Sequence, residues 1–338
     1  MQRRTPRTVA RPTPAPDQTE AQMTTSTPGP THVPRHYLMC RPTYFTVSYE
    51  INPWMDRALP VDTALAVSQW ERLRDVYLDL GHRVEQIDPE PGLPDMVYAA
   101  NGATVVDGLV YSALFRHPER APEGPAYLKW FADRGYVTHS ADHVNEGEGD
   151  LLVAGDVVLA GTGFRTERSA HREAAGLWGR EVVTLELVDP RFYHLDTALV
   201  VLRGSEGAPG VAPGGTPPPF LAPLPDDAAH PDSAPHPGTA RPATDVSVDL
   251  AYYPPAFSPA SQELLAERFP DAHHATEADA LVLGLNAVSD GRHVVHTPAA
   301  THFAGALAER GYETVAVDTS ELLRGGGGAK CCTLEIRS

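Results

Sequence analysis

The sequence is poor in cysteine, and this scarcity excludes two kinds of architecture. Its 338 residues include only three cysteines, Cys40, Cys331 and Cys332. They form neither a disulfide framework nor the paired Cys-x-x-Cys spacing of a metal site. We therefore expect a protein of the reducing cytoplasm. The two adjacent thiols follow the glycine run 325–328 near the end of the sequence, and this placement needs another explanation.

Long apolar runs and an excess of positive charge are also missing. No stretch approaches the ~18 consecutive apolar residues of a membrane-spanning helix, so no membrane partner is expected. The formal net charge of -17 argues against a nucleic-acid partner for the folded part. An acidic protein suits a small cationic substrate instead.

Two segments lack hydrophobic periodicity. Residues 1–36 begin with four arginines among the first sixteen residues and contain frequent prolines, which predicts a disordered tail. Residues 204–245 hold eleven of the 33 prolines and separate two apolar stretches typical of strands. We interpret 204–245 as a disordered Pro-rich surface insertion within a single catalytic domain that spans residues 37–338.

The rest of the sequence repeats one pattern of helix, strand, polar turn and further strand. Five amphipathic helices are predicted, and four of them end at a glycine followed by a strand. The helices are expected at residues 62–80, 126–135, 169–179, 258–270 and 301–311. The strings "DRGYVT" and "ERGYET" show the similarity of two units directly. Five α/β units with a period of roughly 45 residues predict a closed ring rather than an ordinary α/β domain.

Each unit places polar residues in the turn that follows its strand. In unit order these residues are Asp95 and Asn101; Glu146, Glu148 and Asp150; His194 and Asp196; Asn286; and Cys331. Equivalent positions of a cyclic repeat point to one axis, so these side chains are expected to share a central site. The thiol near the end of the sequence is then the fifth unit's contribution to that site.

A site of this composition favours a cationic substrate. A thiolate is the nucleophilic form of cysteine, and His194 can carry protons for it. Carboxylates raise the pKa of a neighbouring thiol, so their presence beside Cys331 makes sense if the substrate itself is positively charged. A guanidinium group fits because it is planar and offers up to five donors to carboxylate acceptors.

Six motifs in order now identify a resemblance. They are "LPDMVYAAN", "FRHPER", "EGEGD", "GFRTER", "YHLDT" and "GGAKCCT". From about residue 37 to the end, apart from the insertion, the sequence resembles the guanidino-group-modifying enzymes of the pentein superfamily. These include arginine deiminase, dimethylarginine dimethylaminohydrolase, arginine dihydrolase and amidinotransferases. The resemblance implies a five-bladed α/β propeller with pseudo-fivefold repeats.

The resemblance also implies catalytic roles. Cys331 is expected to be the nucleophile, with Cys332 a spectator, and His194 the general acid and base. The acidic motif has one residue more than the family pattern between its first acid and Asp150. Glu146 and Glu148 are therefore both candidates for the catalytic acid, and we prefer Glu148.

The implied substrate contacts come from several of the same motifs. They are Asp95, Asn101, Arg120, Arg165, Asp196 and Asn286. The carboxylates are expected to contact the guanidinium group, and the two arginines its α-carboxylate. Asn101 stands where deiminases and dimethylarginine hydrolases commonly carry Asp, and arginine dihydrolases carry Asn.

The expected function is that of a cysteine-dependent amidinohydrolase without a metal or cofactor. It would act on a methylated arginine or arginine in a dimethylargininase-like reaction that gives citrulline and an amine. The alternatives are an arginine deiminase or dihydrolase that gives citrulline or ornithine plus ammonia, or an amidinotransferase. A more distant alternative is a catalytically inactive arginine-binding protein. The sequence is compatible with a homo-oligomer as well as with a monomer.

Overall fold

The computed structural model describes residues 29–204 and 248–337. Most of the tail expected at 1–36 and nearly all of the insertion expected at 204–245 lie outside these described residues. The strands on either side of the insertion, β9 (Leu199–Arg203) and β10 (Asp249–Tyr252), pair antiparallel with each other. The chain on either side of the segment therefore belongs to one sheet.

The first long helix shows how local sequence sets the element. Asp62 caps α1 (Thr63–Asp79) by accepting a hydrogen bond from the backbone N–H of Leu65. Trp70, Leu73 and Tyr77 on its predicted apolar face are completely buried. Packing of this face against the sheet stabilises the helix far more than propensity alone.

Four more helices of the predicted kind follow along the chain. They are α2 (Glu123–Asp133), α3 (Arg168–Trp178), α5 (Pro259–Arg268) and α7 (Thr301–Glu309). The glycines predicted to end α1, α2, α3 and α7 all have positive φ, between 61° and 87°. This left-handed conformation is nearly free of cost only for glycine, and it turns the chain out of the helix into the next strand.

The described strands form five sheets of three strands each. The first is built from β1 (His36–Cys40), β2 (Arg83–Ile87) and β15 (Leu334–Glu335); the second from β3 (Ala103–Val106), β4 (Leu109–Ser112) and β5 (Val137–His139); the third from β6 (Leu151–Ala154), β7 (Val157–Thr162) and β8 (Glu181–Glu186); the fourth from β9, β10 and β11 (His273–His274); the fifth from β12 (Val288–Ser289), β13 (His293–His296) and β14 (Glu313–Ala316). In every sheet the middle strand pairs antiparallel with one neighbour and parallel with the other. This mixed α/β pattern, repeated five times, fits the pseudo-fivefold arrangement expected from the sequence.

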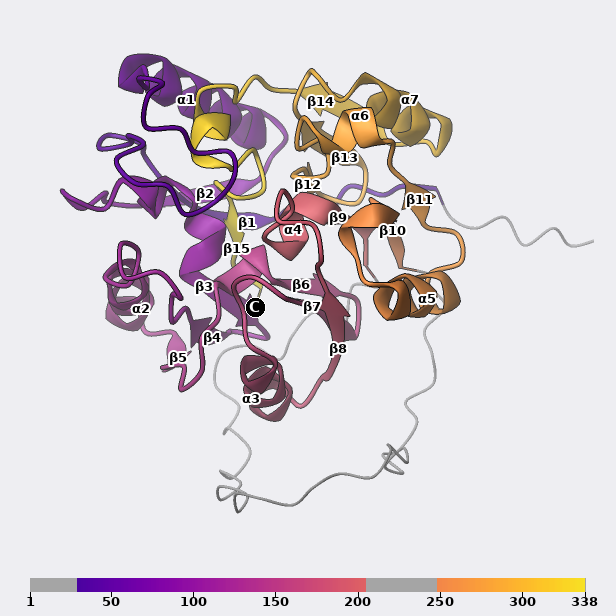
Figure 1. Ribbon diagram of the computed structural model, residues 1–338, viewed down its shortest axis with the longest axis horizontal. Helices are drawn as coiled ribbons and strands as arrows, with labels where there is room; N and C mark the ends of the chain where they lie inside the picture. The colour runs from indigo at the N-terminus through magenta and orange to yellow at the C-terminus, as the bar shows by residue number, and fades with distance from the viewer. Residues whose placement is uncertain (1–28, 205–247, 338) are drawn as a thin grey trace, which may run out of the picture.

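The polar turns of the sequence fold into short helices. These are η1 (Pro94–Val97), η2 (Ala99–Gly102), η3 (Gly147–Gly149), α4 (Leu195–Ala198) and η5 (Leu322–Gly325); two further short helices, η4 (Pro254–Ala256) and α6 (Glu277–Ala280), belong to the fourth unit. Figure 1 shows the five long helices around the perimeter, with α4 and β15 nearer the middle. The long helices therefore cover the outside, and the short ones carry the polar residues inward.

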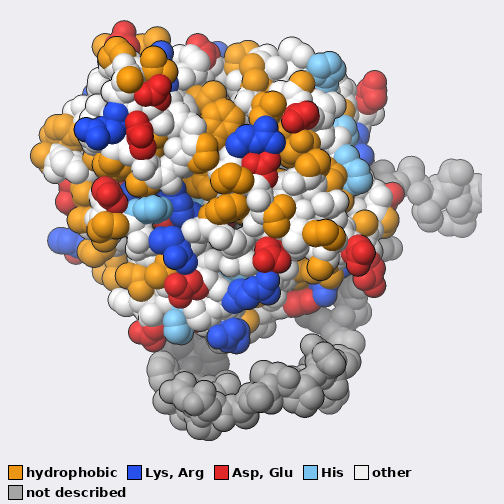
Figure 2. Space-filling view, in the orientation of Figure 1, with side chains coloured by type: hydrophobic (Ala, Val, Ile, Leu, Met, Phe, Trp, Pro, Cys, Tyr) orange, Lys and Arg blue, Asp and Glu red, His pale blue; other side chains and the backbone are white. Residues whose placement is uncertain are grey.

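The apolar core lies between each sheet and its helix. In the second unit, for example, Tyr127 and Phe131 of α2 pack into one cluster with Val105 and Val110 of β3 and β4. On the face shown in Figure 2, acidic and basic side chains are interspersed. Among the described residues, no helix combines the length and the apolar character needed to cross a membrane.

Candidate active site

One amide holds the nucleophile loop in place. The side-chain Oδ1 of Asn286 accepts hydrogen bonds from the backbone N–H groups of Gly328, at 2.8 Å, and Cys331, at 3.1 Å. Its Nδ2 lies 3.1 Å from the Cys331 Sγ and also donates to the backbone oxygen of Asp196. Asn286, a predicted site residue, thus joins the thiol to the segment that carries Asp196.

The glycine run before the thiol allows an unusually close approach of backbone to side chains. A Cβ on Gly327 would lie 2.5 Å from the Tyr98 ring and 2.8 Å from the Cys331 Cβ. A Cβ on Gly325 would lie 2.1 Å from the Tyr98 hydroxyl oxygen. No larger residue fits at these positions without displacing the loop, which accounts for the glycines in front of Cys331.

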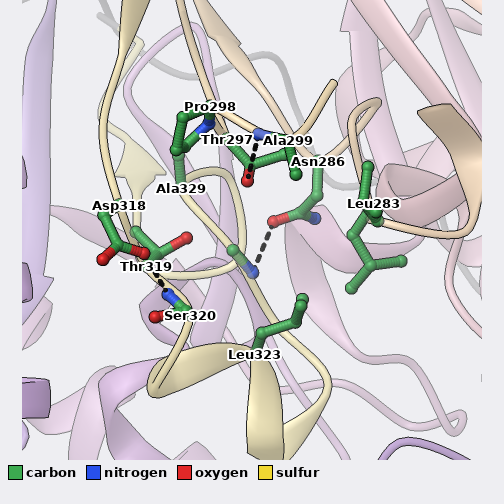
Figure 3. A pocket seen from close by; sticks show the side chains of 12 residues that line it. Leu283, Asn286, Thr297, Pro298, Ala299, Asp318, Thr319, Ser320, Leu323 and Ala329 are labelled. Carbon is green, nitrogen blue, oxygen red and sulfur yellow. Dashed lines mark hydrogen bonds between the residues drawn. The ribbon is translucent and has the colours of Figure 1, made fainter. Parts of the chain in front are cut away.

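A cavity of about 150 Å³ borders the same loop. Gly328 and Ala329 of the loop line it together with Leu283, Asn286 and Leu323. Figure 3 shows the Asn286 oxygen directed toward a loop nitrogen beside this space, with a dashed line for their hydrogen bond. One side of the loop therefore faces open volume rather than packed side chains.

The catalytic histidine of the sequence prediction is held by a buried carboxylate. His194 Nε2 lies 2.7 Å from Glu146 Oε2, and Arg165 Nη1 donates to the same oxygen at 2.9 Å. Burial acts to raise the pKa of Glu146, but the Arg165 guanidinium and the His194 hydrogen bond together hold this pKa well below its ordinary value. An ionised Glu146 only accepts, so His194 Nε2 must carry the donated proton.

This arrangement leaves the other imidazole nitrogen ready to accept a proton. His194 Nδ1 is buried and has no hydrogen-bond partner among residues 29–204 and 248–337. In the neutral ring with Nε2 protonated, Nδ1 carries the free lone pair. Nδ1 can therefore accept a hydrogen bond, and the role of His194 as general acid and base stays a prediction.

Glu148, the residue preferred from the sequence as catalytic acid, points elsewhere. Its carboxylate accepts a hydrogen bond from Lys330 Nζ at 2.7 Å and pairs with the Arg337 guanidinium. It also accepts from the backbone N–H of Glu335 at 3.0 Å. The geometry thus favours Glu146 over Glu148 as the acid beside His194.

Asp150 supports the segment that carries His194. Its two oxygens accept hydrogen bonds from the backbone N–H of Leu195, at 3.0 Å, and from the hydroxyl of Thr166, at 2.7 Å. Both bonds orient neighbouring turns, so Asp150 positions other groups.

Two carboxylates of the predicted site keep an unused buried oxygen. The Oδ1 atoms of Asp95 and Asp196 are buried without a hydrogen-bond partner in the part of the chain that the structure describes. Burial raises the pKa of Asp95, and it raises the pKa of Asp196 to about 6. An unpartnered buried polar group typically costs about 1–3 kcal/mol. Such a cost is expected where a ligand supplies the missing donors.

The surroundings of Cys331 disfavour its thiolate form. Burial raises the pKa of Cys331 well above its ordinary value, and the negative charge of Asp196 raises it further. Asp196 Oδ2 lies 3.3 Å from the Cys331 Sγ. A positive group bound against Asp196 would cancel this repulsion and lower the thiol pKa.

Asn101 connects two parts of the site. Its Oδ1 accepts from Arg120 Nη1 at 2.9 Å, and its Nδ2 donates to the backbone oxygen of Glu146 at 3.3 Å. Arg120 is buried and forms two hydrogen bonds with Glu123, at 2.7 and 3.0 Å. Arg165 is equally buried and also donates to a backbone oxygen at residue 51. Both guanidinium groups already have internal partners, and their contact with a substrate carboxylate stays a prediction.

Sequence reasoning missed two charged members of this network. Glu123 is completely buried, and burial raises its pKa to about 7 despite the adjacent Arg120. Lys330 stands directly before the nucleophile and binds Glu148. The signal for Glu123 was its place three residues after Arg120, at the start of a helix, where the two side chains meet.

The fold and the site together define a class of enzyme. No family model matches the chain. The N-terminal domain of ArgZ, a cyanobacterial arginine dihydrolase solved with its substrate, superposes with a TM-score of 0.73 at 30% identity, over 90% of this chain and 98% of that domain. An adduct structure of dimethylarginine dimethylaminohydrolase superposes with a TM-score of 0.63 at 16% identity, which supports the fold alone. The chain belongs to the pentein superfamily of guanidino-group-modifying enzymes.

Two curated relatives place it more narrowly. The chain is 50% identical over 302 residues to the N(G),N(G)-dimethylarginine dimethylaminohydrolase of Mycobacterium tuberculosis, covering 89% of this chain and 86% of that protein. It is 31% identical over 306 residues to the bifunctional arginine dihydrolase/ornithine cyclodeaminase ArgZ of Synechocystis sp., covering 88% of this chain and 37% of that protein.

Proposed function

We propose that this protein hydrolyses the guanidino group of a methylated arginine, giving citrulline and an amine. The observation that carries the proposal is the set of three buried polar atoms without partners, His194 Nδ1, Asp95 Oδ1 and Asp196 Oδ1. The two Asp Oδ1 atoms are carboxylate oxygens that can accept hydrogen bonds, and His194 Nδ1 can accept a proton. Asp196 also contacts the thiol of Cys331. This set complements a cationic, planar, donor-rich group. The relative that shares half of its residues with this chain bears the corresponding name.

The first half of the reaction forms a covalent bond. The guanidinium binds against Asp95 and Asp196, and its charge lowers the pKa of the Cys331 thiol. The thiol proton passes to His194, and the thiolate attacks the guanidinium carbon. His194 then protonates the departing amine as the carbon–nitrogen bond breaks. An amidino thioether on Cys331 remains.

The second half restores the enzyme. His194, neutral again, removes a proton from a water molecule that attacks the thioether carbon. The carbon–sulfur bond breaks, Cys331 regains a proton, and the ureido group of citrulline is released. Glu146 stays ionised and stabilises the imidazolium that forms in each half.

The fold part of the proposal is a closed five-bladed propeller formed by one catalytic domain over residues 37–338, working in the cytoplasm. The pairing of β15 with β1 supports closure, because it places strands from both ends of the chain in one sheet. A ring closed in this way brings the turns of all five units to the same centre.

Hydrolysis of arginine itself is the second candidate. Asn101 supports it, because its neutral amide lies between Arg120 and the acidic turn where an Asp would add charge. After one ammonia has left, the ureido oxygen of bound citrulline would be repelled by Asp but can accept from an amide. Retained citrulline could then undergo a second attack and yield ornithine. The resemblance to ArgZ points in the same direction.

A product assay separates the candidates. The purified protein is incubated with dimethylarginine, monomethylarginine and arginine, and citrulline, ornithine, ammonia and methylamines are quantified. The main proposal expects citrulline and dimethylamine from dimethylarginine, and the second expects ornithine and ammonia from arginine. Transfer of the amidino group to an added amine would indicate an amidinotransferase. Binding of arginine without any product would overturn hydrolysis and indicate an arginine-binding protein.

Asn101→Asp tests the basis of the second candidate. If Asn101 retains citrulline, the variant lowers the ornithine-to-citrulline ratio obtained from arginine. A high ratio that survives the substitution would contradict this role.

A further inference from the structure

A histidine-rich cluster lies apart from the nucleophile loop and the acidic turns. His32 precedes β1, Asp290 lies in the turn between β12 and β13, and His293 is the first residue of β13. One ligand-type atom from each of the three lies within 4.8 Å of the others. The side chain of Asp290 is only 1% exposed, whereas those of His32 and His293 are 28% and 16% exposed.

The carboxylate of Asp290 is oriented by its own turn. Oδ1 accepts hydrogen bonds from the backbone N–H groups of Arg292, at 2.8 Å, and His293, at 2.6 Å. This leaves Oδ2 to face the imidazoles, at 2.8 Å from His32 Nδ1 and 2.7 Å from His293 Nδ1. The Nδ1 atoms of His32 and His293 therefore both lie close to Asp290 Oδ2, and the turn fixes the orientation of this carboxylate.

His82 adjoins the cluster, but its hydrogen bonds give it a supporting role. Its Nδ1 accepts from the backbone N–H of Arg35 at 3.1 Å, so the neutral ring carries its proton on Nε2. Nε2 lies 3.4 Å from Asp290 Oδ2 and can donate to it. His82 thus has no lone pair to offer a metal and instead helps to fix the carboxylate.

His293 shows the outer contact that is typical of a metal-binding histidine. Its Nε2 lies 3.3 Å from Glu313 Oε2, while Nδ1 faces the cluster. Histidines that ligate metals almost always donate their other ring N–H to such an acceptor, which directs the remaining lone pair to the metal. Glu313 and His82 together supply the orienting contacts that a ligand set of this size requires.

We propose that His32, His293 and Asp290 bind a divalent late transition-metal ion, with zinc the best match. Two imidazole nitrogens and one carboxylate oxygen are the donors that Zn²⁺ takes, and a tetrahedral site would be completed by water on the exposed side. Neighbouring ligand atoms in such a site lie about 3.3 Å apart. The two nitrogen–oxygen distances, 2.8 and 2.7 Å, would each have to lengthen by about half an ångström to admit the ion.

The consequence of binding would be structural. His32 leads into the sheet that contains β1, whereas Asp290 and His293 belong to the sheet of β12–β14. The backbone already connects these parts, because Val33 N donates to the Asp290 oxygen at 3.0 Å. A bound ion would hold the first and fifth sheets together. No metal was expected from the sequence, whose cysteines lack the spacing of a metal site. His32 is far in sequence from Asp290 and His293, so no local motif indicates this cluster.

The test measures zinc binding directly. The full chain is prepared as the Cys331→Ser variant, so that the nucleophilic thiol does not compete, and is stripped of metal with a chelator. Titration calorimetry with ZnCl₂, metal content after dialysis and thermal melting are then measured. One zinc ion per chain and a higher melting temperature are expected.

Matched substitutions place the ion. In this background His32→Ala is expected to weaken zinc binding by at least about tenfold and to remove the zinc-dependent rise in melting temperature. His302→Ala is the control, since His302 is a 69% exposed histidine near Asp279 that offers only a two-residue surface pair. It should leave both measurements unchanged.

Asp290→Asn is a second variant, and it is expected to preserve the backbone conformation of the turn between β12 and β13. Its Oδ1 still accepts the two backbone bonds, but the ligating oxygen becomes an amide nitrogen, so zinc binding is expected to fall at least as far as in His32→Ala. The proposal is overturned if the parent protein binds no zinc, or if His32→Ala binds it as tightly as the His302→Ala control. The cluster would then be a hydrogen-bonded support only.

Discussion

The two adjacent cysteines are both buried, but their neighbours differ. Both belong to the apolar cluster that includes Leu73 and Tyr77, and the Sγ of Cys331 also lies within hydrogen-bond distance of Asp196 and Asn286. Cys331→Ser is expected to reduce turnover by at least about a thousandfold, because it removes the covalent route. Cys332→Ser should retain most activity. The check is kcat for both purified variants, and an inactive Cys332→Ser with an active Cys331→Ser would reverse the assignment.

The two candidate acids also make a matched pair. Glu146→Gln removes the charge that holds His194 with Nε2 protonated, so kcat is expected to fall by about a hundredfold or more. Glu148→Gln breaks contacts with Lys330 and Arg337, and is expected to lower the melting temperature more than kcat. Steady-state kinetics and thermal melting of both variants provide the test. A greater loss of kcat in Glu148→Gln would restore the sequence-based preference.

The thiol pKa gives a prediction whose sign can be worked out. Asp196 raises the pKa of Cys331, so Asp196→Asn should lower it and move thiolate formation to lower pH. At a given pH below that pKa, the free variant should react faster with iodoacetamide while its turnover falls, because the substrate cation has lost a partner. The measurement is the alkylation rate of the Cys331 peptide against pH. Slower alkylation of the variant would show that Asp196 assists thiol ionisation instead.

At the scale of elements, the glycine run defines the nucleophile loop. Gly327→Ala forces a Cβ into the Tyr98 ring and the Cys331 side chain, so the thiol must move and activity should fall at least tenfold. Gly305→Ala is the control, because it lies within α7 with no atom within 4 Å of the new Cβ. It should leave activity intact and stabilise the protein by about 0.5–1 kcal/mol. Comparable activities of the two variants would contradict a tightly positioned loop.

The long elements could be predicted from the sequence because their signals are local. Helix periodicity and the glycines that follow it identified α1, α2, α3 and α7. The helix predicted at 258–270 corresponds to α5, which Ser258 caps and which ends at Arg268 without a glycine. The repeat pattern predicts a strand after α5, and this prediction was partly wrong. Only β11 (His273–His274) forms there before α6, since Thr276 caps a new helix by accepting from the backbone of Asp279.

The register of the acidic turn could not be predicted, because it depends on backbone geometry. Gly147 has a φ of 55°, and η3 turns the chain so that Glu146 and Glu148 point to different partners. Repeat position predicted that Asn286 lies near Cys331, and the two side chains are 3.1 Å apart, whereas the catalytic role of His194 stays a prediction. Contacts between units, such as those of His32 with Asp290, carry no local signal at all.

At the scale of the whole molecule, strands from the first and last parts of the described chain meet in one sheet. β15 pairs with β1 antiparallel, and Ile336 N donates to the His36 oxygen at 2.8 Å. The Arg337 guanidinium pairs with Glu148 in the acidic turn. The loop that carries Cys331 lies directly before β15 in sequence. The pairing of β15 with β1 therefore fixes one end of this loop, and the hydrogen bonds of Asn286 fix its backbone at Gly328 and Cys331.

The insertion between β9 and β10 provides the last prediction. These strands pair from Arg203 with Asp249 to Leu199 with Tyr252, so the hairpin is complete without the intervening residues. Deleting residues 206–242 shortens the connection from about 45 to about 8 residues, which lowers the loop-closure cost by about 1.5 kcal/mol. The variant should therefore melt slightly higher and keep its activity.

A control variant with a connection of unchanged length distinguishes the effect of loop-closure entropy from the effect of lost contacts. Replacing residues 206–242 by a Gly/Ser segment of the same length should leave both the melting temperature and kcat as they are, because flexible loops of equal length have similar closure costs. Stabilisation by the deletion together with a neutral replacement would identify the segment as a tolerated insertion. A marked loss of stability in both variants would show that it packs on the fold. Loss of kcat alone would show that the segment contributes to the site. This is conceivable in space because β9 directly follows α4, the helix that contains Asp196.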